Sequence, residues 1–265
     1  MTELGRPTTA HALGLDDVGL TLDWAGVTDV GRRRAHNEDS YLADSPLFVV
    51  ADGMGGHSAG DVASDAVVRR MSEIPSRPFA TTDDVETALR VATADIAVAA
   101  ADTELGVGTT ATGAFLSRDG DEGDVEFTVF NVGDSRVYLF EDGLLRQVTV
   151  DHSVVQEMVD AGLLHADDAE KHPDSNVITR AVGFDVDPRP DYWRLPARPG
   201  LRLLVCSDGL TKELPAARIA DLLASVEGAE AAATALVEAA VDAGGRDNVT
   251  AVVVDVRGSS TSDAD

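Results

Sequence analysis

Short apolar segments recur along this chain, and several of them are followed within three residues by aspartate and glycine. Each is five to eight residues long, which is an ordinary length for a β-strand. Tight turns join neighbouring strands in antiparallel pairs, and Asp142-Gly143 is a typical hairpin turn. The segments predict antiparallel β-sheet. They are Leu47–Ala51, Val125–Val132, Arg136–Phe140, Leu144–Val148, Leu201–Cys206 and Val249–Val256.

Four other segments have helical patterns. Thr82 begins one of them with N-capping chemistry, and another ends at Gly244-Gly245, which is typical of a helix C-terminus. Amphipathic helices combined with antiparallel strands predict a layered α+β fold. The helical segments are Ala59–Met71, Thr82–Glu104, Ser153–Ala161 and Ala229–Ala243.

One domain is predicted over residues 19–257. The chain has 265 residues, of which 44% are apolar, and this is enough for a sizeable core. Residues 1–18 have no clear periodicity and are expected to form a flexible N-terminal extension. Residues 258–265 are small and polar, so a disordered tail is expected there.

The net charge of the chain limits the kinds of partner that it is expected to bind. The chain has 47 acidic and 21 basic residues, a net charge of −26. Nucleic-acid phosphates and anionic lipids repel a polyanion, so neither nucleic acid nor a membrane is expected as a primary partner. Cys206 is the only cysteine, which excludes an intrachain disulfide. The sequence shows no secretory leader and no apolar run of membrane-spanning length. A cytoplasmic, monomeric protein is the expectation.

Four aspartates lie where predicted strands end or begin. They are Asp52, Asp134, Asp208 and Asp247. The first three are each next to a glycine, and Asp247 comes just before the predicted strand Val249–Val256. Carboxylates gathered at one edge of a sheet repel one another unless a cation binds between them. Ligands that are all oxygen suit Mg²⁺, Mn²⁺ or Ca²⁺. Asp-Gly is also an ordinary turn pair, so the pattern leaves a turn role open for each aspartate.

Six motifs in a fixed order resemble the bacterial branch of the metal-dependent protein phosphatases, the PPM family of type 2C. They extend from residue 34 to residue 250, nearly the whole predicted domain. The motifs are Arg34-Ala35-His36-Asn37-Glu38-Asp39-Ser40, Ala51-Asp52-Gly53-Met54-Gly55-Gly56-His57, Gly108-Thr109-Thr110, Gly133-Asp134-Ser135-Arg136, Cys206-Ser207-Asp208-Gly209 and Asp247-Asn248-Val249-Thr250.

The resemblance implies a four-layer α-β-β-α sandwich with two central antiparallel sheets and two metal ions, Mn²⁺ or Mg²⁺, at one end. Asp52 would bridge both ions, and the Gly53 carbonyl would bind one of them. Asp208 and Asp247 would bind the other ion. Glu38 would hold water that is bound to metal.

The implied activity is hydrolysis of phosphoserine and phosphothreonine in proteins that a Ser/Thr kinase has phosphorylated. Arg34 would bind the substrate phosphate through its planar guanidinium. Hydroxide activated by the two metals would attack phosphorus in line, without a phosphoenzyme. Some relatives place a histidine directly after the Asp-Gly pair as a general acid. Here that residue is Met54, and water bound to metal is the preferred acid.

A third, weaker metal site would be shared by Asp134 and Asp208. Many relatives have an aspartate four residues after the second of these, where this chain has Lys212. An ammonium there should repel a third cation by about 1–4 kcal/mol at surface-like dielectric, so a weak or absent third site is predicted. The segment from Asp151 to Arg180 resembles the flap of the family.

Other phosphate enzymes fit the sequence less well. A cysteine phosphatase needs arginine six residues after its nucleophile, and Lys212 stands there after Cys206. The glycine-rich Asp52–His57 segment lacks the Gly-Lys-Ser/Thr of a P-loop. A phosphate-binding pseudophosphatase and a phosphatase of small molecules remain as alternatives.

Overall fold

The structure is a computed structural model of the chain. The residues that it describes are 1–13, 19–55, 59–75, 77–102, 106–120, 123–184 and 188–258. The predicted tail therefore lies outside the described residues except for Gly258, which ends a strand.

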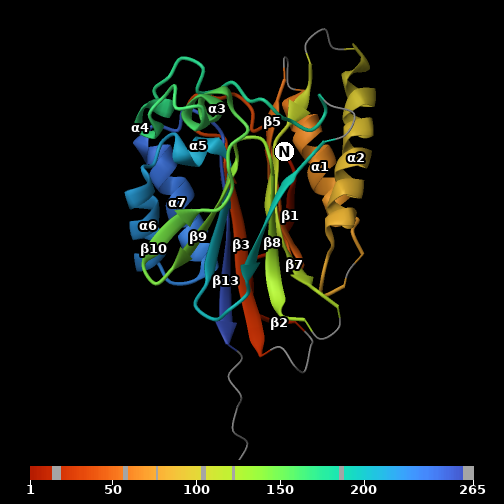
Figure 1. Cartoon of the computed structure of the whole chain (residues 1–265), viewed down its shortest axis with the longest axis vertical. Helices are drawn as coiled ribbons and strands as arrows, with labels where there is room; N and C mark the ends of the chain where they lie inside the picture. Colours follow the sequence, from red (N-terminus) through yellow and green to blue (C-terminus); the bar gives the residue numbers. More distant parts are fainter. Residues whose placement is uncertain are drawn as a thin grey trace, which may run out of the picture.

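Two β-sheets form the centre of the molecule (Figure 1). Within the described residues the first sheet has seven strands, with β6 (Gly108–Thr109) paired to β5 beside the main path. Its path is β1 (Glu3–Gly5), β4 (Asp39–Asp44), β5 (Leu47–Met54), β7 (Ala111–Arg118), β8 (Val125–Val132) and β11 (Asp191–Pro196). The second sheet runs β10 (Leu144–Gln147), β9 (Arg136–Glu141), β12 (Arg202–Cys206), β13 (Val249–Gly258), β3 (Leu20–Asp29) and β2 (Thr8–Ala12).

Helices lie on the outer faces of the sheets. Helices α1 and α2 cover the first sheet, and α6 and α7 cover the second, while α3, α4 and α5 gather near one end of the sheets (Figure 1). No helix in the described ranges has the length and apolar character of a membrane span. The helices are α1 (Gly60–Ser72), α2 (Thr82–Ala99), α3 (Val154–Asp160), α4 (Ala166–Ala169), α5 (Asp208–Thr211), α6 (Ala216–Ser225) and α7 (Ala229–Ala243).

Three apolar cores hold these elements together. Between the sheets, Trp24 of β3 meets Phe48 of β5 edge to face, with ring centroids 5.6 Å apart. The second core joins α1 and α2 to the first sheet, and the third joins α6 and α7 to the second sheet. Because each sheet is buried on both faces, its central strands are apolar along most of their length.

The predicted α+β fold with two sheets is confirmed. Helix α7 has the predicted bounds, and Asp142-Gly143 turns between β9 and β10 with positive φ at both residues. Three details were wrong. Helix α2 ends at Ala99 and a 3₁₀ turn follows it, β5 continues past Asp52 to Met54, and β1 pairs with β4 in parallel, so the first sheet is not wholly antiparallel.

The N-terminal segment is also more ordered than predicted. Strands β1 and β2 contradict a flexible extension for residues 3–12, because β1 extends the first sheet and β2 extends the second. The Thr2 backbone carbonyl accepts a hydrogen bond from Tyr41 N at 2.9 Å, and its N–H donates to Ser40 Oγ at 2.9 Å. The first residues therefore bridge the edges of the two sheets, a pairing that local periodicity does not reveal. Residues 14–18 lie outside the described part.

Candidate metal centre

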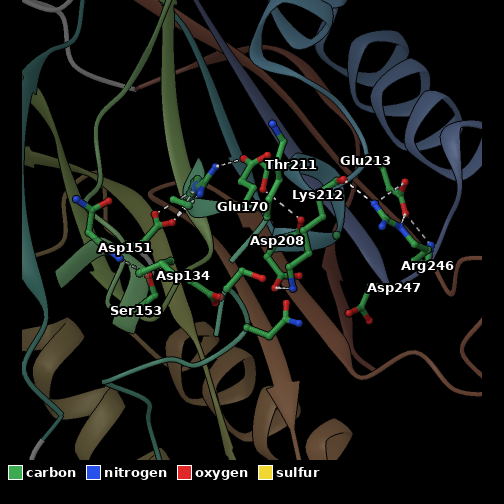
Figure 2. A pocket seen from close by; sticks show the side chains of 18 residues that line it. Asp134, Asp151, Ser153, Glu170, Asp208, Thr211, Lys212, Glu213, Arg246 and Asp247 are labelled. Carbon is green, nitrogen blue, oxygen red and sulfur yellow. Dashed lines mark hydrogen bonds and ion pairs between the residues drawn. The ribbon is translucent and has the colours of Figure 1, made fainter. Parts of the chain in front are cut away.

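The predicted aspartates approach one another because the two sheets bring distant segments to one end of the molecule. Asp52 lies in β5 of the first sheet. Asp208 begins α5 two residues after the end of β12, and Asp247 lies two residues before the start of β13, the strand paired with β12 in the second sheet. Asp134 lies in the link between β8 and β9, which joins the sheets. Asp134, Asp208 and Asp247 border one cavity (Figure 2).

Asp52 has a fixed backbone and a free carboxylate. Its N–H donates to Thr110 Oγ1 at 2.9 Å, and its carbonyl accepts from Thr110 N and from Thr109 Oγ1, both at 2.9 Å. No residue in the described ranges donates a hydrogen bond to its side-chain oxygens. Desolvation raises the pKa of Asp52 well above its usual value, and the nearby charges of Asp39 and Asp208 raise it further.

Asp39 is a member of the cluster that sequence reasoning missed. It pairs with Asp52 across β4 and β5 and is fully buried. Its Oδ2 accepts from Ser207 Oγ at 2.8 Å and from Thr250 Oγ1 at 2.6 Å, while its Oδ1 has no partner in the described structure. Burial raises the pKa of Asp39 to about 7. The one available sequence signal was its place beside Glu38 in the first motif.

Only one of the two side-chain oxygens of Asp208 has a partner among the described residues. The Lys212 ammonium pairs with Oδ2 one helical turn away, whereas Oδ1 is buried without a partner among the described residues. Burial and then the charge of Asp208 raise the pKa of Asp134 to about 7. Lys212 is thus a cation placed inside the cluster by the chain itself.

Asp247 and Arg34 form the exposed side of the cluster. Arg34 Nη2 lies 2.8 Å from Asp247 Oδ2, and the arginine side chain is 51% exposed. This hydrogen bond raises the pKa of Arg34. The other aspartate oxygen, Oδ1, accepts from Asn248 N at 2.9 Å. Arg34 can therefore turn toward a ligand in solvent without breaking a buried contact.

Glu38 and Gly53 lie where α1 begins. Burial raises the pKa of the half-buried Glu38 carboxyl, while a hydrogen bond from the Gly60 backbone opposes the shift. Gly53 N donates to the Glu38 carbonyl at 3.2 Å. A Cβ on Gly53 would lie 2.1 Å from Gly60 O, so only glycine lets β5 and the start of α1 approach this closely.

The donor set fits hard divalent cations. The side chains offer carboxylate oxygens, and two of these oxygens are buried without partners among the described residues, which is costly unless a cation binds them. In the described part of the chain, no three carboxylate, histidine or cysteine side chains are already closed around one point. Arg34 pairs with Asp247 and Lys212 pairs with Asp208, so each of these two carboxylates would have to share its charge with a metal.

The predicted site residues thus lie in one region. Asp39, Asp134, Asp208 and Asp247 all act electrostatically on Asp52. Arg34 and Glu38 border the same cluster through Asp247, which interacts with both. His57, singled out only for its nearness in sequence, lies outside the described residues.

Comparison with known proteins identifies the family to which this chain belongs. The model of the family described as protein phosphatase 2C matches residues 31–244. A serine/threonine phosphatase of Listeria welshimeri is 37% identical over 241 residues, covering 86% of this chain and 93% of the relative. The PstP serine/threonine protein phosphatase of Mycobacterium tuberculosis is 38% identical over 251 residues, covering 90% of this chain and 46% of the relative. The chain belongs to the protein phosphatase 2C family.

Solved structures agree with this assignment. The crystal structure of the M. tuberculosis phosphatase PstP has a TM-score of 0.81 and 36% identity, covering 89% of this chain and 99% of the other. A second structure, the catalytic domain of PstP in complex with two manganese ions, has a TM-score of 0.78 and 36% identity, covering 90% and 99% of the two chains. A bound pair of manganese ions thus occurs in a structural relative of this chain.

The raised pKa values predict a stability that falls with pH when metal is absent. Asp39 and Asp134 have pKa values of about 7 in the folded state, against about 4 in the unfolded chain. The two protonated carboxyls stabilise the folded state fully below about pH 4, and this stabilisation is lost as pH rises through 7. The free energy of unfolding falls by about 1 kcal/mol per pH unit for each proton released. In EDTA, the free energy of unfolding from urea titrations should therefore fall between about pH 5 and pH 8.

The Asp39→Asn variant should show a shallower fall, because it removes one titrating group and keeps a hydrogen-bond acceptor. Asp221→Asn, an exposed change on α6, serves as the control. Equal slopes in all three proteins would contradict the raised pKa of Asp39.

Proposed function

We propose that this chain hydrolyses phosphoserine and phosphothreonine in proteins with the help of two divalent cations, Mn²⁺ or Mg²⁺. The observation that carries the proposal is the buried carboxylate cluster, in which two oxygens have no partner in the described part of the chain, bordered by an exposed arginine. The family and the relatives that are named serine/threonine phosphatases support the substrate class.

Some residues of the site would bind the metal ions and others would bind the substrate. Asp52, whose carboxylate has no donor in the described structure, would hold both ions. The Gly53 carbonyl would help to hold one ion, and Asp208 and Asp247 would hold the other. Glu38 would accept hydrogen bonds from water in the ions' shell. Two bound cations would lower the pKa of water and neutralise the phosphate ester. Asp39, with one buried oxygen free, joins the cluster as a further acceptor.

Arg34 would receive the phosphate. Its guanidinium is half exposed and is held by Asp247, so its fork faces solvent at the rim of the cluster. Hydrolysis would proceed by direct, in-line attack of water on phosphorus, with no phosphorylated side chain. Met54 follows Asp52-Gly53, so no histidine at that position donates the proton to the leaving alkoxide, and water fills that role.

The proposed frame for this chemistry is the four-layer α-β-β-α sandwich, supported by the three apolar cores. The physiological substrates would be proteins that a Ser/Thr kinase has phosphorylated, acted on by a cytoplasmic monomer. The pseudophosphatase alternative is disfavoured, because every carboxylate expected in the core of the site is present and directed into one cluster.

Hydrolysis of a phosphothreonine peptide tests the proposal. Purified protein should release phosphate with Mn²⁺ or Mg²⁺, and EDTA should abolish release. Asp208→Ala should lower kcat at least a hundredfold, because it removes a ligand that no neighbour replaces. Asp221→Ala, on an exposed face of α6, should match the wild type. Folded protein with no turnover under any metal would contradict the enzyme and favour a phosphate-binding protein.

We further propose that a third metal ion binds weakly or not at all. The Lys212 ammonium is paired with Asp208 and is close enough to Asp134 to affect its pKa, so it supplies positive charge where a third cation would lie. Native mass spectrometry over a manganese series should find two ions per chain in the wild type. Lys212→Asp should bind a third at millimolar concentration. Three ions in the wild type, or two in both proteins, would contradict the role of Lys212.

A further inference from the structure

A cavity of about 480 Å³ adjoins the candidate metal centre (Figure 2). Asp134, Asp208 and Asp247 of the cluster border it, and part of the remaining lining comes from α3, α4 and the residues that follow α4, including Gln156 and Lys171. A phosphorylated residue at the metal centre would therefore have its sequence neighbours at or inside this cavity. The volume is within the range of ordinary ligand pockets and leaves room for a peptide side chain.

Basic residues are concentrated in the wall. The chain has two lysines, Lys171 and Lys212, and both line this cavity. Arg136 and Arg246 line it as well. Six carboxylates line the same cavity, three from the cluster (Asp134, Asp208 and Asp247) and three beyond it (Asp151, Glu170 and Glu213). Beyond the cluster, Arg136, Lys171 and Arg246 balance those three carboxylates, so this part of the wall is neutral in a protein of net charge −26.

Most carboxylates in the wall already have cation partners. Asp151 accepts from Arg136 Nη2 at 2.7 Å and is almost fully buried. Glu213, with a side chain 5% exposed, accepts from Arg246 Nε at 2.8 Å. Glu170 is the exposed carboxylate of the wall, 63% exposed and 3.8 Å from Arg136 Nη1. These pairs remove much of the negative charge that would repel an acidic ligand.

Lys171 differs from the other three cations. It follows α4, its side chain is exposed, and no residue in the described ranges forms an ion pair with its ammonium. Arg246 is also accessible, with its side chain 68% exposed. Among the described residues, the cavity thus presents one ammonium without an ion pair and one accessible guanidinium to whatever enters it, and its lining also includes the hydrogen-bonding side chains of Gln156 and Asn176.

We propose that this cavity binds an acidic side chain of the substrate, close in sequence to the phosphorylated residue, and that Lys171 and Arg246 select it. The inference rests on the proposed function and names a substrate preference for the same site. Complementary charge also matters for encounter, because the net negative charge of the protein repels acidic peptides while the exposed Lys171 attracts them locally.

Matched phosphothreonine peptides test this preference. Each pair carries Glu or Gln at one of the three positions on either side of phosphothreonine, and kcat/KM is measured with saturating Mn²⁺. We expect the wild type to favour Glu at one or more positions by about two- to fivefold, the range of an exposed ion pair. Added salt should reduce the ratio, because it screens exposed charges.

The Lys171→Met variant should bring the ratio of kcat/KM for the Glu peptide to that for the Gln peptide close to one, and Lys171→Glu should reverse the preference. Both variants should hydrolyse p-nitrophenyl phosphate as the wild type does. Arg194→Met removes an exposed arginine on β11, outside the cavity, and should leave the ratio unaltered. A ratio of one in the wild type, or a ratio that Lys171→Met does not change, would overturn the inference while turnover itself persists. If the wild type turned over none of these substrates, the proposed function would be contradicted, and the inference with it.

Discussion

Mutual repulsion among buried carboxylates is the constraint on which the rest of the structure depends. The charges of Asp39, Asp134 and Asp208 each raise the pKa of Asp52, and the charge of Asp208 also raises the pKa values of Asp39 and Asp134. A fold keeps such a cluster only if surrounding packing supplies the free energy. Here the two sheets do so, since their apolar cores bury most of the central strands that carry the aspartates. Bound cations would convert the repulsion into binding energy.

The scaffold fixes the backbone and leaves the reactive oxygens free. Thr109 and Thr110 hold the backbone of Asp52, and Ser207 and Thr250 hold one oxygen of Asp39. The second oxygen of Asp39 and one oxygen of Asp208 stay without partners in the described structure. Preorganised ligands of this kind pay the cost of ordering during folding, before any ion or substrate binds. Lys212 offsets part of the charge from within the chain.

The sequence predicted the elements that local patterns specify. Helix α7 and the hairpin at Asp142-Gly143 follow from short-range periodicity and turn chemistry, and the aspartates were visible because they flank apolar strands. Asp39 could not be placed in the cluster, because its role depends on the register between β4 and β5. The N-terminal strands were missed for a similar reason, since their partners lie in two different sheets. The resemblance to a family supplied the assignment of ligands.

The most direct test is anomalous diffraction from crystals of the protein grown with Mn²⁺, collected at the manganese absorption edge. We expect two strong anomalous-difference peaks within bonding distance of Asp52, one of them also beside Asp208 and Asp247, and no third peak beside Lys212. Peaks elsewhere on the surface, or none at the aspartate cluster of a folded protein, would contradict the claim that these carboxylates form a metal centre.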